Sequence, residues 1–188
     1  RDHVPPANGP RPTLIMTMRG QDKAGFAKRL EKGIAVSTQP DIRWGRRDIK
    51  TVQLLPNLLA KQAAKKAGAF EAWLVDEEGY VTEGSSTTAW IVDDSGTLIT
   101  RDLSNAILPG VTRQIMLQAA HETQMKVVER KFTVAEALKA REAFLSSATG
   151  AAVPVVTIDD QKIGSGAPGP LTRRIRELYA ERSAPKKR

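Results

Sequence analysis

Two hydrophobic patterns alternate along the chain, one that repeats every three to four residues and one made of short apolar runs. The first pattern predicts helices, because residues three and four positions apart share one face of a helix. Proline at the start of such a run and glycine just after it mark where the helix begins and ends. These signals predict helices at residues 21–32, 56–67, 112–122, 134–139 and 170–181.

The short apolar runs predict strands, since turn clusters at residues 77–79 and 93–96 separate several of them. We expect strands at residues 11–20, 34–37, 71–75, 80–82, 88–92, 97–100, 126–130, 143–147 and 153–158. Residues 41–50 also fit a strand, with one lysine approaching the next helix. This mixed order predicts an α/β (mixed α+β) fold in which helices wrap a twisted, strongly curved sheet.

The composition fits one substantial domain, or one domain plus a fragment of another. The 188 residues are 40% hydrophobic and 27% charged, which is ordinary for a globular soluble protein. No apolar run approaches the roughly 20 residues of a membrane-spanning helix, so we expect no membrane partner. Arg1 is an unusual translational start, so we expect the N-terminal part of a longer protein to be missing.

Cysteine is absent, and histidine occurs only at His3 and His121. This excludes disulfides, thiolate catalysis and cysteine-ligated zinc, and it argues against a protein-bound metal. The lack of cysteine also fits a cytoplasmic protein. The net charge of +8 comes from basic residues spread along the chain, without an aromatic stacking motif. We therefore expect a basic surface and no nucleic-acid partner.

Two segments carry a reactive or ionisable side chain. Lys50 ends residues 41–50. A lysine traps carbonyl compounds only where its surroundings favour the neutral amine, and most lysines are merely solvated. Glu83 is followed by a glycine and four hydroxyl residues. It belongs either to a simple turn between strands or, if buried, to a site that keeps a pyridine nitrogen protonated.

Two further segments suit an anion. Residues 107–113 form a loop that opens into a helix, where the amides of Val111 and Thr112 and the Thr112 hydroxyl can bind a phosphate. An ordinary helix start explains the same residues, and by itself it is the better explanation. Residues 144–150 end a predicted strand with hydroxyl groups that can add phosphate donors.

In this order and with these separations, the four segments resemble the fold-type-IV, or class IV, pyridoxal-phosphate-dependent aminotransferases. That family also includes branched-chain aminotransferase and aminodeoxychorismate lyase. The resemblance runs from Arg1 to about Ser183. It implies a large cofactor-binding domain at residues 33–188, with a barrel-like sheet, preceded at residues 1–32 by the end of a smaller N-terminal α/β domain and an interdomain helix. It also implies pyridoxal 5'-phosphate as cofactor, amino acid and 2-oxo acid substrates, and a homodimer.

The resemblance assigns roles by position. Lys50 matches the Schiff-base lysine, Glu83 the carboxylate that pairs with the pyridine nitrogen, and Leu108 the side chain packed on the ring. Ala148 replaces a threonine that is common in the family, so only its amide could bind phosphate, and Thr88 stands where asparagine is common. The other cofactor-binding positions are Ser86, Gly110, Val111, Thr112 and Ser147.

Arg1 and His3 bear on the choice of substrate. They either belong to a solvated loop or match the arginine and histidine with which D-amino acid aminotransferases trap the substrate carboxylate across a dimer interface. The second reading implies transfer of an amino group from a D-amino acid such as D-alanine or D-glutamate. The alternatives are an L-branched-chain aminotransferase, the lyase, and an inactive truncated cofactor-binding fragment.

Residues 164–169 satisfy the G-x-G-x-x-G pattern of dinucleotide sites. The acidic residue expected about 20 positions later would lie at or beyond the chain end. Pro168 and Pro170 instead predict a rigid turn before the last helix. His121 has no nucleophile pattern beside it, so we expect a surface or packing histidine.

Overall fold

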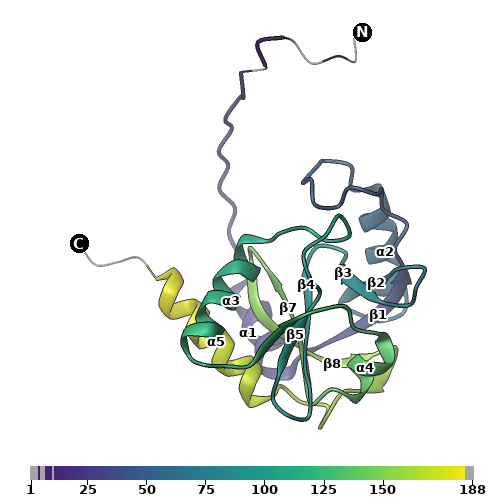
Figure 1. The fold of residues 1–188 in the computed structure, drawn as a ribbon, viewed down its shortest axis with the longest axis vertical. Helices are drawn as coiled ribbons and strands as arrows, with labels where there is room; N and C mark the ends of the chain where they lie inside the picture. The colour runs from purple at the N-terminus through teal and green to yellow at the C-terminus, as the bar shows by residue number, and fades with distance from the viewer. Residues whose placement is uncertain (1–3, 5–6, 10, 185–188) are drawn as a thin grey trace.

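The computed structural model describes Val4, residues 7–9 and residues 11–184 (Figure 1). Arg1 and His3, the pair predicted for the substrate carboxylate, lie outside the described residues. Within the described part of the chain, no helix is long and apolar enough to cross a membrane.

Helices and strands follow one another along the chain largely as the hydrophobic pattern predicts. The helices are α1 (Lys23–Lys32), α2 (Leu55–Lys66), α3 (Val111–Glu122), α4 (Val134–Lys139) and α5 (Pro170–Ser183). The strands are β1 (Ile34–Pro40), β2 (Glu71–Val75), β3 (Val81–Gly84), β4 (Thr88–Val92), β5 (Leu98–Thr100), β6 (Val127–Glu129), β7 (Glu142–Ser147), β8 (Gly150–Ile158) and β9 (Gln161–Lys162). Pro56 and Pro170 lie in the first turns of α2 and α5, where a helix has no use for the missing N–H.

The strands of the described chain form one sheet in the order β3-β2-β1-β8-β7-β4-β5-β6, with β9 paired to β8. β1 runs parallel to β2 and β8, and β5 runs parallel to β6. The sheet curls until its two ends meet. At this junction the N–H of Val81 in β3 donates to the carbonyl of Phe132, which follows β6, at 3.0 Å. Tyr80 and Thr133 form a β-bridge at the same seam. The predicted barrel-like sheet with helices around it is therefore confirmed (Figure 1).

The central strands are buried on both faces. Along β4, Ala89 and Ile91 face the core inside the curved sheet, whereas Trp90 and Val92 face the helices outside it. Trp90 stacks on Phe144 of β7 with 5.5 Å between ring centroids. The outer core is completed by apolar side chains of α3 and α5, which pack on each other and on this face of the sheet. These buried layers explain why the strands read as continuous apolar runs in the sequence.

Residues 11–20 do not form the predicted strand. They pair with no strand of the described chain, and Leu14 and Met18 are 84% and 98% exposed. In Figure 1 this segment leads away from the sheet. A strand needs a neighbour for its backbone N–H and C=O groups, and the residues that the structure describes supply none here.

Residues 41–50 are not a strand either, so that prediction is also wrong. β1 ends at Pro40, which lies opposite Val75 at the end of β2. Beyond this point Asp41 and Arg43 form buried ion pairs instead of alternating across a sheet. Lys50 therefore lies on an irregular loop between β1 and α2 rather than on a strand.

The sequence pattern does not predict β9. The hairpin turn before it places Asp159 and Asp160 in the left-handed region, with φ of 45° and 61°, where asparagine and glycine are usual. The Asp159 carboxylate accepts from the N–H and the hydroxyl of Thr38 at 2.7 and 2.6 Å. These tertiary bonds offset the backbone strain, and local sequence does not reveal them.

Residues 164–169 form the expected turn before α5. A Cβ on Gly164, which has φ of 52°, would lie 2.1 Å from the carbonyl oxygen of Arg141, so glycine serves close packing here. The N–H groups of Leu171 and Thr172 donate to the buried Glu142 carboxylate at 3.0 and 2.8 Å. The Glu142 carboxylate thus occupies two amides at the start of α5, so few free N–H groups remain there for a dinucleotide phosphate.

Candidate functional site

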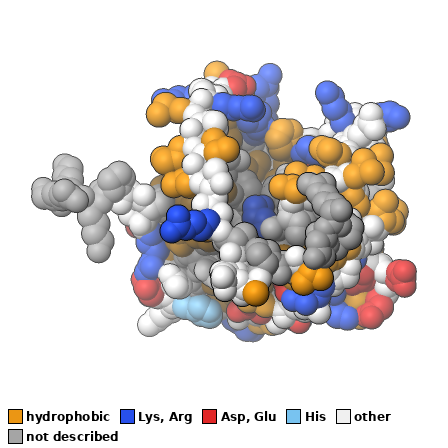
Figure 2. Space-filling model, turned by 90° about the horizontal axis from the view of Figure 1, so that it is seen from above, with side chains coloured by type: hydrophobic (Ala, Val, Ile, Leu, Met, Phe, Trp, Pro, Cys, Tyr) orange, Lys and Arg blue, Asp and Glu red, His pale blue; other side chains and the backbone are white. Residues whose placement is uncertain are grey.

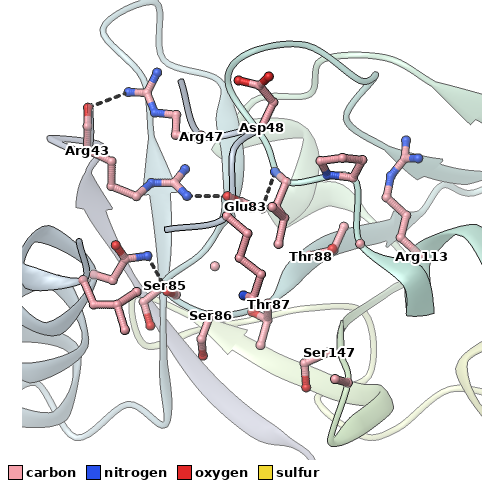
Figure 3. Close-up of a pocket in the computed structure, with 18 of the residues that line it drawn as sticks. Arg43, Arg47, Asp48, Glu83, Ser85, Ser86, Thr87, Thr88, Arg113 and Ser147 are labelled. Atoms are coloured by element: carbon pink, nitrogen blue, oxygen red, sulfur yellow. Dashed lines mark hydrogen bonds and ion pairs between the residues drawn. The ribbon is translucent and has the colours of Figure 1, made fainter. Parts of the chain in front are cut away.

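A cavity of about 760 Å³ lies where the four chemically distinctive segments meet (Figure 3). Its walls come from the β1–α2 loop, the β3–β4 turn, the start of α3 and the β7–β8 turn. All nine residues predicted to hold the cofactor line it: Lys50, Glu83, Ser86, Leu108, Gly110, Val111, Thr112, Ser147 and Ala148. The fold therefore brings together positions that lie up to about a hundred residues apart, while their roles stay predictions.

Glu83 lines the cavity near the end of β3. It is 6% exposed and bonds to two partners, the guanidinium of Arg43 and the backbone N–H of Leu108, the latter at 3.2 Å. Burial raises the pKa of Glu83 above its ordinary value, and the positive charge of Arg43 opposes that rise. The family resemblance implies that Glu83 pairs with a protonated ring nitrogen, and the residue lines the cavity.

Arg43 is held between two carboxylates. Its Nε and Nη2 donate to Asp41 at 2.8 and 2.7 Å, and Nη1 donates to Glu83. Burial raises the pKa of Asp41, but bonds from Arg43 and Thr82 and the charge of Arg47 outweigh it, so the pKa lies below its ordinary value. A buried arginine between two acids is a fixed charge cluster, since guanidinium stays protonated under any condition the fold survives.

The start of α3 forms another part of the cavity wall. Gly110 caps the helix without a side-chain hydrogen bond, and the N–H groups of Val111 and Thr112 have no partner among the described residues. The Thr112 hydroxyl donates to the Ser147 carbonyl at 3.1 Å. Two free amides at a helix start suit an anion. The Thr112 hydroxyl would have to rotate away from Ser147 before it could donate to that anion.

Lys50 approaches the cavity from the β1–α2 loop and is exposed. The loop is held in place near the lysine, because Arg46 donates to Asp48 at 2.9 and 2.8 Å and the Arg47 N–H donates to the Asn105 carbonyl at 2.9 Å. Lys50 is therefore exposed at the cavity on a loop that these hydrogen bonds hold in place.

The β3–β4 turn is fixed from behind by a second buried acid. Glu71 is 1% exposed, and it accepts from the hydroxyls of Ser85 and Ser86 at 2.5 and 3.2 Å. Lys61 of α2 lies 3.1 Å from the same carboxylate. Asn57 donates to the Ser85 carbonyl at 2.7 Å. The hydroxyl of Ser86 is thus engaged with Glu71, and it anchors the turn that borders the cavity.

Sequence reasoning missed several side chains that line this cavity. Arg43 and Arg113 were not singled out, although a buried arginine demands acidic partners and therefore marks a site. Thr87 was also missed. Its hydroxyl is buried without a hydrogen-bond partner among the described residues, and it borders the cavity. An unpaired buried hydroxyl is a group that a bound ligand can satisfy.

Comparison with known proteins points to one family. A family model described as amino-transferase class IV matches residues 3–158. D-alanine aminotransferase from Bacillus licheniformis is 41% identical over 148 residues, which are 79% of this chain and 52% of that protein. D-alanine aminotransferase from Staphylococcus haemolyticus is 36% identical over 180 residues, which are 95% of this chain and 62% of that protein. The chain spans only a little over half the length of these relatives.

Solved structures agree on the fold. The branched-chain amino acid aminotransferase of Escherichia coli has a TM-score of 0.70 and 29% identity, over 79% of this chain and 51% of that chain. The branched-chain enzyme from Thermobaculum terrenum in its PLP form has a TM-score of 0.72 and 29% identity, over 80% of this chain and 51% of that chain. In both comparisons, too, this chain corresponds to about half of the known protein.

Proposed function

Since the chain belongs to the class IV aminotransferase family, we propose that it is the cofactor-binding part of a pyridoxal-phosphate-dependent transaminase. One observation carries the proposal: Lys50, the buried Glu83 and the free amides of α3 border a single cavity. These three groups differ in chemistry, and each matches a different part of pyridoxal 5'-phosphate.

The residues fit that cofactor part by part. The free N–H groups of Val111 and Thr112 suit the phosphate. The Glu83 carboxylate suits a protonated pyridine nitrogen, and the Lys50 amine suits the aldehyde. Thr87 adds a buried hydroxyl that has no partner among the described residues. Bound there, the cofactor would supply an electron sink that makes the Cα–H bond of an amino acid easier to break.

The chain's own residues would then divide the work. Lys50 would bond to the cofactor and, once the substrate amine displaces it, carry the proton removed from Cα. Glu83 would keep the proton on the ring nitrogen. Leu108, whose side chain borders the cavity, would pack against the ring and limit its movement. The α3 amides would hold the phosphate and so fix the reacting end relative to Lys50.

For the substrate, we favour a D-amino acid such as D-alanine or D-glutamate, with a 2-oxo acid as acceptor. The D-alanine aminotransferases at 36–41% identity support this choice. An L-branched-chain substrate is the second candidate, because structures of branched-chain enzymes share the fold at TM-scores of 0.70 and 0.72. Arg1 and His3, which the D-amino acid assignment places at the substrate carboxylate, lie outside the described residues.

A homodimer forms part of the proposal. Apolar side chains are exposed on α2 and on the loop before it, including Val52, Leu55 and Leu58 at 97%, 65% and 61% exposure. Figure 2 shows hydrophobic side chains gathered over this part of the molecule. A contiguous apolar patch of this kind is typical of an interface. The loop that carries Lys50 belongs to the same region, so a second copy would border the cavity.

Reductive trapping tests the cofactor assignment. The chain is mixed with pyridoxal 5'-phosphate, reduced with borohydride, and its intact mass and peptides are measured. We expect one added cofactor per chain, located on Lys50, and no addition to Lys50→Ala. Lys66→Ala, which removes an exposed lysine of α2 outside the cavity wall, serves as the control and should be labelled like wild type. Absence of label on Lys50 would contradict the proposal and favour an inactive fragment.

A further inference from the structure

We infer that Arg43 is a positioning residue that holds the Glu83 carboxylate in its ionised form and aims it at the ring nitrogen of the cofactor, with Asp41 as its counter-charge. The inference rests on the proposed function and adds a role for Arg43 and Asp41, which have none in that proposal. It is carried by the geometry of these three side chains, and Figure 3 shows the ion pair of Arg43 with Glu83.

The guanidinium of Arg43 uses separate edges for the two acids. Nε and Nη2 donate to the two oxygens of Asp41 in a bidentate pair, and Nη1 donates to Glu83. The side chains of Arg43, Asp41 and Glu83 are 8%, 0% and 8% exposed. At this burial, water contributes little to the stability of the charges, so each charge depends on the others.

Asp41 fixes the direction in which Arg43 points. Besides the two bonds from the Arg43 guanidinium, Asp41 accepts from the Arg43 backbone N–H at 3.2 Å and from the Thr82 hydroxyl at 2.7 Å. It also lies 3.5 Å from Nε of Arg47. Asp41 is therefore saturated with donors and has no freedom to swing. The remaining guanidinium nitrogen of Arg43 is left to meet Glu83.

Glu83 is consequently held at both oxygens. Oε1 accepts from Arg43, and Oε2 accepts from the backbone N–H of Leu108. An ionised carboxylate has about four acceptor sites, so acceptor capacity remains on the side that borders the cavity. A neutral Glu83 would carry an O–H donor and would lack the negative charge that stabilises a protonated ring nitrogen.

Burial and charge oppose each other at Glu83. Burial raises the pKa of Glu83, whereas Arg43 lowers it. The charged groups that line the cavity with Glu83 are Arg43, Arg47, Asp48, Lys50 and Arg113. Of these, only Arg43 bonds to the Glu83 carboxylate in the described structure. Burial is the largest influence on the Glu83 pKa, the nearby charge of Asp41 also raises it, and Arg43 is the main group that lowers it.

The first experiment uses the cofactor-free chain, so its outcome does not depend on the proposed function. Glutamate labelled with ¹³C at the carboxyl carbon reports the titration of Glu83 by NMR, with Glu83→Gln to assign the signal. We expect the midpoint to rise by at least about one pH unit in Arg43→Gln, since an opposite charge at this range shifts a carboxyl by about 1–3 units. Arg43→Lys keeps the charge without the fork and should lie between the two.

Arg46→Gln is the matched control, because Arg46 lies in the same loop but pairs with Asp48 and is half exposed. It should titrate like wild type. Arg43→Gln leaves Asp41 with Arg47 as its only nearby counter-charge among the described residues. If this variant does not fold, the double variant Arg43→Gln/Asp41→Asn is compared with Asp41→Asn, because Asp41 also raises the pKa of Glu83. An unchanged Glu83 midpoint in these variants would overturn the inference.

The second experiment uses the loaded protein and pyridoxal phosphate labelled with ¹⁵N in the ring. We expect the ¹⁵N shift of a protonated ring nitrogen in wild type and in Arg46→Gln at pH 8, and that of an unprotonated nitrogen in Arg43→Gln. Identical shifts in wild type and Arg43→Gln would overturn the inference. Failure of wild type itself to bind the cofactor would count against the proposed function, while the titration of the cofactor-free chain would still decide the role of Arg43.

Discussion

The backbone N–H of Leu108 donates to Oε2 of Glu83 at 3.2 Å, although the two residues are 25 positions apart. Leu108 stands two residues before Gly110, which caps α3. This bond therefore ties the carboxylate at the end of β3 to the segment that presents the free amides of α3. The fold therefore sets the distance between the Glu83 carboxylate, which can bind a cation, and the α3 amides, which can bind an anion, before any ligand binds both.

The first prediction concerns Glu83 and stability. We expect the free energy of unfolding of cofactor-free Glu83→Gln, measured relative to wild type, to be higher at pH 8 than at pH 4. The reason is that burial raises the pKa of Glu83 in the folded state. Such a group costs stability as the pH rises from its unfolded-state value through its folded-state value. Urea denaturation at the two pH values measures this difference.

Glu31→Gln, at an exposed position of α1, is the control and should change the free energy of unfolding by less than about 0.5 kcal/mol at both pH values. A Glu83→Gln variant that is less stable than wild type at pH 8 would show that the bonds to Arg43 and Leu108 outweigh the burial cost. Glutamate at position 83 would then favour both the stability of the fold and the proposed role at the cofactor.

The second prediction concerns Thr112, whose buried hydroxyl joins the start of α3 to the β7–β8 turn through the Ser147 carbonyl. We expect Thr112→Val to lower the free energy of unfolding by about 0.5–1.5 kcal/mol, the usual value of one such bond. If the hydroxyl turns toward a bound phosphate, affinity for pyridoxal 5'-phosphate should also fall at least about tenfold. Fluorescence titration measures the affinity.

Thr123→Val separates the two effects of Thr112→Val. Thr123 ends the same helix, and its hydroxyl donates to the Ala119 carbonyl at 2.9 Å, outside the cavity wall. Its loss should lower stability and leave cofactor affinity unchanged. Equal cofactor affinity in wild type and Thr112→Val would mean that the hydroxyl keeps its bond to Ser147 and that only the amides serve the phosphate.

The third prediction concerns the apolar patch around α2. We expect the chain to sediment as a dimer and Leu58→Glu to shift it to monomer, because a buried charge without a partner is costly at an interface. Gln118→Glu, at an exposed position of α3, adds the same charge elsewhere and should leave the dimer intact. A wild-type chain that stays monomeric at micromolar concentration would remove the dimer from the proposal.

Much of the fold follows from local sequence. Gly33 after α1 and the prolines at positions 56 and 170 mark helix boundaries that the structure reproduces. The predicted strands recur within a few residues, because their apolar runs are buried on one or both faces of the sheet. The strand predicted at residues 11–20 is absent, because an apolar pattern does not reveal whether a neighbouring strand is available for pairing.

The candidate site depended more on the family resemblance than on local pattern. The free amides at the start of α3 could be foreseen, since they follow from helix geometry. The role of Arg43 could not, because its partner Glu83 is 40 positions away and the pairing depends on how β1 and β3 flank β2. The same long-range pairing turned the expected strand at residues 41–50 into a loop.

The most direct test of the central claim is the visible spectrum of the pyridoxal-phosphate-loaded chain before and after addition of D-alanine, with L-leucine as the parallel sample. We expect D-alanine alone to remove the absorption of the lysine-bound cofactor and to release one equivalent of pyruvate. A loss with L-leucine and none with D-alanine would contradict the D-amino acid assignment in favour of a branched-chain enzyme. A spectrum that neither amino acid changes would contradict transaminase activity in this chain.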